Sequence, residues 1–192
     1  MTISSLKEFS IYSDYCCKRN FLSNDECRAL IDLRSKLRIR PGEISANGAV
    51  NQEIRKCHIA WIPKHSEHEW IYDKIISFVD KRNKTYFKYD IVGLELLQYT
   101  VYDTPDDHYN MHIDGDNKLL DNGYHRKLSF SVQISDPGTY EGSDLELWDR
   151  QIAAKEQGAI TVFSSFRPHV VTPLRSGTRL AIVGWASGPP FR

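Results

Sequence analysis

The segment Lys127-Leu128-Ser129-Phe130-Ser131-Val132-Gln133-Ile134-Ser135 alternates polar and apolar side chains over its whole length. Successive side chains of a β-strand point to opposite faces of a sheet, so this period of two predicts a strand. We interpret the strand as half-buried, with its apolar face on a core. Asp136-Pro137-Gly138 follows directly and is typical of a turn. The segment therefore predicts a fold that is built around a sheet.

The rest of the chain divides into a helical first part and a second part rich in strands. Residues 145–148, 159–163 and 179–185 are short and mainly apolar, which favours three further strands. Ser23-Asn24-Asp25-Glu26 has the form of a capping box before apolar residues at helical spacing, so we expect a helix over residues 24–37. Ser66-Glu67-His68-Glu69 predicts a second helix in the same way. The predicted fold class is α+β, mainly β.

A chain of 192 residues fits one domain. We therefore expect residues 1–192 to form a single domain. Roughly residues 1–85 would be a helical supporting region, and roughly residues 90–187 would be the β-rich core. No internal repeat, low-complexity tract or linker divides the sequence.

The bulk charge argues against a nucleic-acid partner, because 25 Lys and Arg balance 25 Asp and Glu and the pI is near 7.0. A small molecule or a peptide is the expected substrate. No run of about 18 apolar residues and no export signal occurs, so we expect no membrane association and a cytoplasmic location. The four cysteines have no pairing spacing and are expected to be free thiols. The sequence does not choose between a monomer and a homodimer.

The residues that carry chemistry gather around His112-Ile113-Asp114. Residues two apart on a strand point to the same face, so His112 and Asp114 can reach one metal ion together. His169 lies between apolar residues suited to a strand and is the best candidate for a third ligand. Two imidazoles and one carboxylate leave coordination positions open, as iron(II) oxygenases require.

The spacing alone is weakly specific, because an isolated His or Asp is more often a surface or hydrogen-bonded residue. Arg179 strengthens the hypothesis. If the chain turns at residues 173–177 and returns antiparallel, Arg179 re-enters the same cavity and offers a planar fork to a carboxylate. A surface salt bridge is the commoner fate of an arginine, but the apolar residues after Arg179 argue for an inward side chain.

These pieces occur in an order that resembles a known family. The ordered matches are 98–102, 109–114, 126–135, 136–147, 169–173 and 177–179. From about Leu97 to Trp185 the chain resembles the 2-oxoglutarate/iron(II) dioxygenases of the prolyl 4-hydroxylase-like group, including their bacterial and phage peptidyl-hydroxylase-type members. The resemblance implies a double-stranded β-helix, or jelly roll, with the N-terminal helices packed on the larger sheet.

The same resemblance implies the cofactors and further site residues. Iron(II), 2-oxoglutarate and dioxygen are expected, with ascorbate as a candidate reductant, and Arg179 would bind the distal carboxylate of 2-oxoglutarate. Tyr102 matches the family's cosubstrate tyrosine, with Tyr99 as the alternative because the following loop is one residue longer and lacks the usual glycine. Tyr109 and Trp185 match positions near the substrate and at the end of the last strand. The usual Gly-Gly is replaced by Gly142-Ser143.

The activity implied is hydroxylation of a substrate C–H bond, at a prolyl or other peptidyl residue, with release of succinate and carbon dioxide. A hydroxylase of a free amino acid or other small molecule stays open as an alternative. So do a nucleic-acid demethylase of the same superfamily, a non-catalytic jelly-roll binding module, and a metal site of the cupin type that would not need Arg179.

Overall fold

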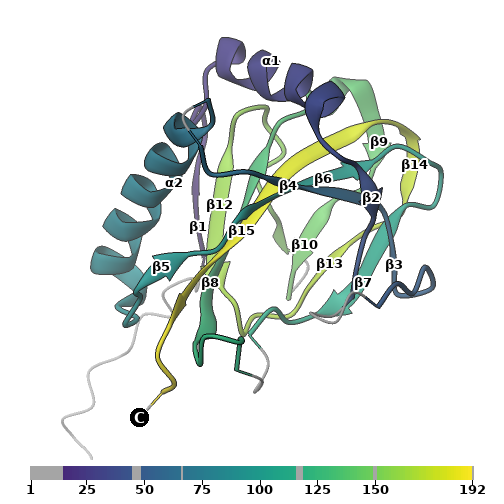
Figure 1. Ribbon diagram of the computed structural model, residues 1–192. Coiled ribbons are helices and arrows are strands. Elements are labelled where there is room, and N and C mark those ends of the chain that lie inside the picture. The colour runs from purple at the N-terminus through teal and green to yellow at the C-terminus, as the bar shows by residue number, and fades with distance from the viewer. Residues whose placement is uncertain (1–14, 45–48, 66, 116–118, 149–150, 192) are drawn as a thin grey trace, which may run out of the picture.

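Two β-sheets face each other and two helices cover the outside of the larger one (Figure 1). The structure is a computed structural model that describes residues 15–44, 49–65, 67–115, 119–148 and 151–191. Within these ranges the larger sheet has eight strands, β1-β12-β8-β15-β6-β4-β2 in spatial order with β5 beside β15. Their bounds are β1 Tyr15–Lys18, β2 Arg40–Pro41, β4 His58–Ile62, β5 Gly93–Leu94, β6 Leu97–Tyr102, β8 His125–Gln133, β12 Ile160–Ser164 and β15 Arg179–Gly188.

The smaller sheet has five strands in the described part of the chain, in the order β11-β10-β13-β7-β3. A two-stranded sheet of β14 and β9 adjoins it. Their bounds are β3 Arg55–Lys56, β7 His108–His112, β9 Tyr140–Gly142, β10 Leu145–Leu147, β11 Gln151–Ile152, β13 His169–Val171 and β14 Leu174–Gly177. All pairings are antiparallel, and the architecture is the jelly roll that the sequence resemblance implied.

The first helix, α1 (Asn24–Leu33), begins as its capping box predicts. Ser23 Oγ accepts from the backbone N–H of Glu26 at 3.2 Å, and Ser23 N–H donates to Glu26 Oε2 at 2.7 Å. The α-helix ends four residues before the predicted limit. A short 3₁₀ turn, η1 (Arg34–Lys36), follows, and Leu37 is already extended.

The second helix, α2 (Glu69–Arg82), has its N-cap two residues later than the Ser66 that the capping box predicts. Ser66 lies outside the described residues, and His68 is the N-cap residue. Its ring Nδ1 lies 3.1 Å from the carbonyl oxygen of Pro63, which ties His68 to the preceding loop. A π-helical turn, η2 (Asn83–Phe87), ends this region, and a 3₁₀ turn, η3 (Pro137–Thr139), follows β8. Neither helix is long and apolar enough to cross a membrane.

The main hydrophobic core lies between the two helices and the larger sheet. Leu30 of α1 and Ile75 of α2 belong to it together with Leu128, Phe130 and Val132 of β8. The N-terminal region also supplies strands to this sheet, since β4 pairs with β6 and β1 pairs with β12.

The other face of β8 is buried as well, so the prediction of a half-buried strand is wrong. Ser129, Ser131 and Gln133 are 2%, 7% and 3% exposed. They lie on the face opposite the core residues, and the smaller sheet covers that face. Ser129 and Ser131 line the cavity between the sheets. The polar half of the alternating pattern thus faces an internal site rather than solvent.

Candidate active site

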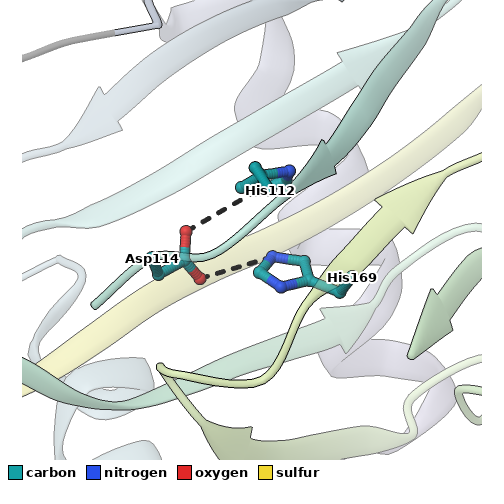
Figure 2. A group of neighbouring side chains, drawn as sticks. All are labelled: His112, Asp114 and His169. Carbon is teal, nitrogen blue, oxygen red and sulfur yellow. Dashed lines mark ion pairs between the residues drawn. The ribbon is translucent and has the colours of Figure 1, made fainter. Parts of the chain in front are cut away.

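His112, Asp114 and His169 converge between the two sheets (Figure 2). One ligand atom from each lies within 4.8 Å of the others. His112 Nε2 is 3.7 Å from Asp114 Oδ1, and His169 Nε2 is 3.4 Å from Asp114 Oδ2. The three side chains that the sequence singled out therefore form one cluster.

Strand pairing positions the two imidazoles. β13 pairs with β7 so that His169 lies opposite His112, and their ring centroids are 4.1 Å apart. Each Nδ1 lies close to a carbonyl oxygen two residues earlier in the chain, 2.7 Å from Asn110 O for His112 and 3.0 Å from Arg167 O for His169. If Nδ1 carries the proton and donates it there, Nε2 is left with its lone pair on the shared side.

The sequence pattern predicted that Asp114 lies on a strand with His112. In the structure Asp114 lies on the loop after that strand. β7 ends at His112, and the backbone N–H groups of Asp114 and Gly115 both donate to Ser165 O, at 3.0 and 2.8 Å. The carboxylate is held by Ser129, whose Oγ donates to Asp114 Oδ2 at 2.6 Å. The backbone bonds to Ser165 replace strand pairing as the support for this ligand.

Burial and mutual charge set the protonation of the cluster. Burial, followed by the charge of His169, lowers the pKa of His112 to about 4. Burial by itself would raise the pKa of Asp114, but His169, His112 and the hydrogen bond from Ser129 outweigh it and hold that pKa below its usual value. At neutral pH a neutral His112 beside an ionised Asp114 is the state that a cation requires of its ligands.

Arg179 lines the same cavity and is 5% exposed. Its Nε donates to Gln133 Oε1 at 3.1 Å, and its guanidinium carbon is 5.5 Å from the centre of the Tyr102 ring. β15 pairs with β6 so that Arg179 lies opposite Tyr102. Within the described part of the chain no carboxylate forms an ion pair with Arg179, so its charge is available to an anion in the cavity.

The path of the chain from His169 to Arg179 differs from the antiparallel return that was expected. β13 lies in the smaller sheet, β14 pairs with β9, and β15 lies in the larger sheet. The chain therefore crosses from one sheet to the other. Gly177 makes the sharp crossing possible with a φ of +79°, where an added Cβ would lie 2.1 Å from Thr139 O.

The two candidate cosubstrate tyrosines lie on opposite faces of the larger sheet. Tyr102 is buried and lines the cavity. Tyr99 lies three residues earlier and therefore faces the helices, where its hydroxyl donates to Leu30 O at 3.0 Å. Of the two, Tyr102 is the residue that lies in the cavity beside Arg179.

Tyr109 and Trp185 both line the cavity as well. The Tyr109 ring stacks on His112 at 3.6 Å between centroids and 19° between planes. The Trp185 ring lies 3.7 Å below the guanidinium carbon of Arg126, which in turn is held by Glu95 at 2.7 Å. Tyr109 is thus adjacent to the ligand cluster, while Trp185 forms part of a wall stiffened by an ion pair.

Sequence reasoning missed several polar residues of the cavity region, among them Ser129, Gln133 and Arg55. The first two stand on the polar face of β8, and the alternating pattern could have pointed to them had that face been taken as internal. Arg55 gives no comparable signal, because β3 has two residues and its position depends on pairing with β7. The cavity that Ser129 and Arg55 share with the ligand cluster has a volume of about 950 Å³.

A second group of possible ligands, His58, Asp103 and Asp107, lies outside this cavity. Asp103 forms an ion pair with Arg34, and Asp107 Oδ2 accepts from the backbone N–H groups of Asp103 and Thr104 at 3.0 Å each. These contacts already satisfy both carboxylates. The group therefore fastens a loop.

A jelly roll that holds two imidazoles, one carboxylate and a buried arginine in one cavity has the features of the mononuclear non-haem oxygenases. A model of the 2OG-Fe(II) oxygenase superfamily matches residues 97–187, a range that contains all four of these residues. Over this range the chain is similar to that superfamily.

Individual proteins show the same relationship. A PKHD-type hydroxylase of Prochlorococcus marinus is 40% identical over 80 residues, which is 40% of this chain and 35% of the relative. A PKHD-type hydroxylase of Hyphomonas neptunium is 34% identical over 85 residues, which is 41% of this chain and 37% of the relative. The matches thus span little more than a third of the length of these curated relatives.

The solved structures extend the likeness over the whole fold. A viral collagen prolyl hydroxylase of Paramecium Bursaria Chlorella virus-1, solved with 2OG, has a TM-score of 0.69 at 22% identity and covers 91% of this chain and 96% of its own. A Trichoplax adhaerens prolyl hydroxylase, solved with a hypoxia inducible factor peptide fragment, has a TM-score of 0.72 at 20% identity and covers 90% and 83%. These likenesses show the fold.

Proposed function

We propose that this protein is an iron(II)- and 2-oxoglutarate-dependent dioxygenase that hydroxylates a C–H bond of an organic substrate and releases succinate and carbon dioxide. The observation that carries the proposal is the convergence of His112, Asp114 and His169 in one cavity with Arg179. Arg179 is buried, and no carboxylate of the described residues forms an ion pair with it. The superfamily match over residues 97–187 supports the same chemistry.

The ligand set fits a small divalent ion. Metal bonds of about 2.0–2.2 Å at right angles separate neighbouring ligand atoms by about 3 Å. The two imidazole-to-carboxylate distances, 3.4 Å from His169 to Asp114 Oδ2 and 3.7 Å from His112 to Asp114 Oδ1, run to different oxygens of one carboxylate and are close to that value. Two nitrogen ligands and one oxygen ligand, with space left in the cavity, are the donor set of iron(II) oxygenases.

Each protein group has a role that follows from its position. Iron(II) and 2-oxoglutarate together would supply the oxidising power of the reaction. Arg179 would hold the distal carboxylate of 2-oxoglutarate through its planar fork, and Gln133 fixes the orientation of that fork from behind. Tyr102 would border the cosubstrate, and Ser129 would keep Asp114 in its ligating orientation.

The substrate would enter beside Tyr109 and Trp185, which leave aromatic surface in the cavity. A prolyl or other peptidyl residue is one class of substrate, and a free amino acid or other small molecule is the other. Balanced charge gives no support to a nucleic-acid substrate. We also propose ascorbate as a candidate reductant. The proposed oligomeric state is a monomer or a homodimer.

The test is a measurement of succinate release from 2-oxoglutarate by the purified protein in air, with and without added iron(II). We expect release that depends on iron and that stops in the His169→Ala variant. Anaerobic addition of 2-oxoglutarate to the iron-loaded protein should also produce the weak visible absorption of the chelate. Absence of both signals in a folded, iron-loaded protein would refute the proposed function.

A further inference from the structure

Arg55 is a second buried cation in the cavity and has no role in the function proposed so far. It lies on β3 of the smaller sheet, is 7% exposed and lines the cavity. Its guanidinium carbon is 4.6 Å from the centre of the Tyr109 ring, and the centre of the same ring is 3.6 Å from that of the His112 imidazole. The Tyr109 ring thus contacts both the Arg55 guanidinium and an imidazole of the ligand cluster.

Among the described residues, every hydrogen-bond partner of Arg55 is electrically neutral. Its Nε donates to Cys57 Sγ at 3.2 Å, Nη1 to Glu43 O at 2.8 Å, and Nη2 to Gln98 Oε1 at 2.7 Å. Burial raises the pKa of the Cys57 thiol, which keeps it uncharged at neutral pH. A guanidinium has five N–H donors, so these three bonds leave two of them for a further acceptor.

The other arginines on the rim of the cavity are neutralised. Arg40 Nη1 lies 3.0 Å from Glu43 Oε1, and Arg126 Nη2 lies 2.7 Å from Glu95 Oε2. In the described ranges of the chain no carboxylate lies within ion-pair distance of Arg55. A buried charge without a counter-ion is costly, and the protein keeps this one where only the cavity can supply an anion.

We propose that Arg55 binds a carboxylate of the substrate, and that the substrate class is a compact molecule with a free carboxyl group. This inference rests on the proposed function, in which Arg179 is reserved for 2-oxoglutarate. Arg55 and His112 both contact the Tyr109 ring, so the distance from the guanidinium carbon to the centre of the imidazole cannot exceed the sum of their distances to the centre of that ring. A carboxylate on Arg55 would therefore share the cavity with the ligand cluster.

The depth of Arg55 restricts the kind of carboxylate that can reach it. A free amino acid or a small organic acid fits within a cavity of about 950 Å³, and the end of a peptide chain offers the same group. A residue in the middle of a peptide has no free α-carboxylate. Arg55 would therefore accept the carboxylate of a peptide's carboxyl terminus or of a small acid. An experiment can distinguish these two sources.

The test compares acids with their amides in binding to the manganese(II)-loaded protein without oxygen, in the presence of 2-oxoglutarate. The probes are L-proline, L-leucine and N-acetylglycyl-L-proline, each with a free and an amidated carboxyl group, measured by titration calorimetry. We expect at least one acid to bind roughly ten to a hundred times more tightly than its amide, since a buried charge-assisted bond distinguishes them. A free amino acid as the best probe indicates a small-molecule substrate, and the acetylated dipeptide indicates a peptide terminus.

The Arg55→Leu variant should lose this preference for the acid, while Arg55→Lys should keep part of it because the charge remains. Arg40→Gln, at a cavity arginine that Glu43 already neutralises, is the matched control and should keep the preference. If Arg55→Leu does not fold, Arg55→Gln takes its place in the comparison. Affinity for 2-oxoglutarate should not change in any of these variants.

Two results overturn the inference. One is that no acid binds the wild-type protein more tightly than its amide. The other is that Arg55→Leu weakens 2-oxoglutarate as strongly as Arg179→Leu does, which would place Arg55 in the cosubstrate site. A failure of the proposed function is seen separately, as absence of succinate release and of the chelate absorption, whereas the acid-to-amide comparison needs no turnover.

Discussion

Ser129 Oγ donates a 2.6 Å hydrogen bond to Asp114 Oδ2, and it lies 2.9 Å from the hydroxyl oxygen of Ser165. Strand β8 of the larger sheet thereby orients Asp114, which lies on the loop that follows β7 of the smaller sheet. Partners of this kind, which hold a ligating group in place, commonly change metal affinity when removed. The serine is buried, so water cannot easily replace its bond.

Replacing Ser129 by Ala should therefore weaken metal binding about 10- to 100-fold and leave the fold intact, because one buried hydrogen bond to the ligand is lost. Anaerobic iron(II) titration measures the change. Ser131→Ala, two residues along the same face and without a contact to Asp114, is the control. Equal affinity of the two variants would show that Ser129 does not orient the ligand.

The three ligands should be indispensable one by one. We expect His112→Ala, Asp114→Ala and His169→Ala each to abolish turnover without unfolding the domain, because each removes one of three donors to a shared ion. Succinate release and circular dichroism report activity and fold. Activity and iron binding that survive the loss of any one residue would mean that the ligand set is assigned wrongly.

Arg179 should govern 2-oxoglutarate and leave iron unaffected. Arg179→Leu should weaken 2-oxoglutarate binding by about 2–5 kcal/mol because a buried carboxylate loses its charge-assisted bonds, and Arg179→Lys should weaken it less. Anaerobic titration of the iron-loaded protein measures the affinity. Arg175→Leu, an exposed residue paired with Glu141, should bind 2-oxoglutarate like the wild type.

The ion pair between the two helices should make stability depend on pH. Lys74 Nζ lies 2.5 and 2.7 Å from the oxygens of Glu26. Burial alone would raise the pKa of Glu26, but the bonds from Lys74 and Ser23 lower it below its usual value. Stability from this group is therefore complete above the usual pKa of about 4.3 and is lost as the pH falls through the lowered value.

Glu26→Gln should accordingly reduce the free energy of unfolding by about 1 kcal/mol at pH 7, a figure kept small because water reaches the pair. Urea unfolding of both proteins at pH 7 and pH 3 measures the difference, which should shrink in acid as Glu26 is protonated. Glu67→Gln, at an exposed carboxylate, is the control. A difference that is the same at both pH values would contradict the role of the ionised pair.

The sequence predicted those features that depend on local pattern. The start of α1 followed from its capping box, and β8 followed from its alternation, because both signals are written within a few neighbouring residues. The end of α1 was placed too late, since apolar spacing continues into the 3₁₀ turn at Arg34, where the chain is drawn toward Asp103 by an ion pair.

Long-range pairing decided what the sequence could not show. The cluster of His112, Asp114 and His169 was predicted from residue type and order, but the loop position of Asp114 comes from its backbone bond to Ser165. The sequence could not decide whether Tyr102 or Tyr99 lies in the cavity. That choice depends on which face of β6 the smaller sheet covers. The position of Arg55 in the cavity could not be predicted, because a strand of two residues has no recognisable sequence pattern. That position depends on the pairing of Arg55 with Tyr109.

Side chains along strands of the larger sheet alternate between the cavity and the helices, so neighbouring residues are under different evolutionary selection. Gln98, Thr100 and Tyr102 of β6 line the cavity, as do Ser129 and Ser131 of β8, while the residues between them hold the helices in place. Substitutions at adjacent positions of one strand thus act on different properties, binding at one and stability at the next. A lineage can change its substrate through single replacements on the inner face while the helical layer stays packed. Directed evolution of this protein can therefore confine a library to alternate codons of these strands.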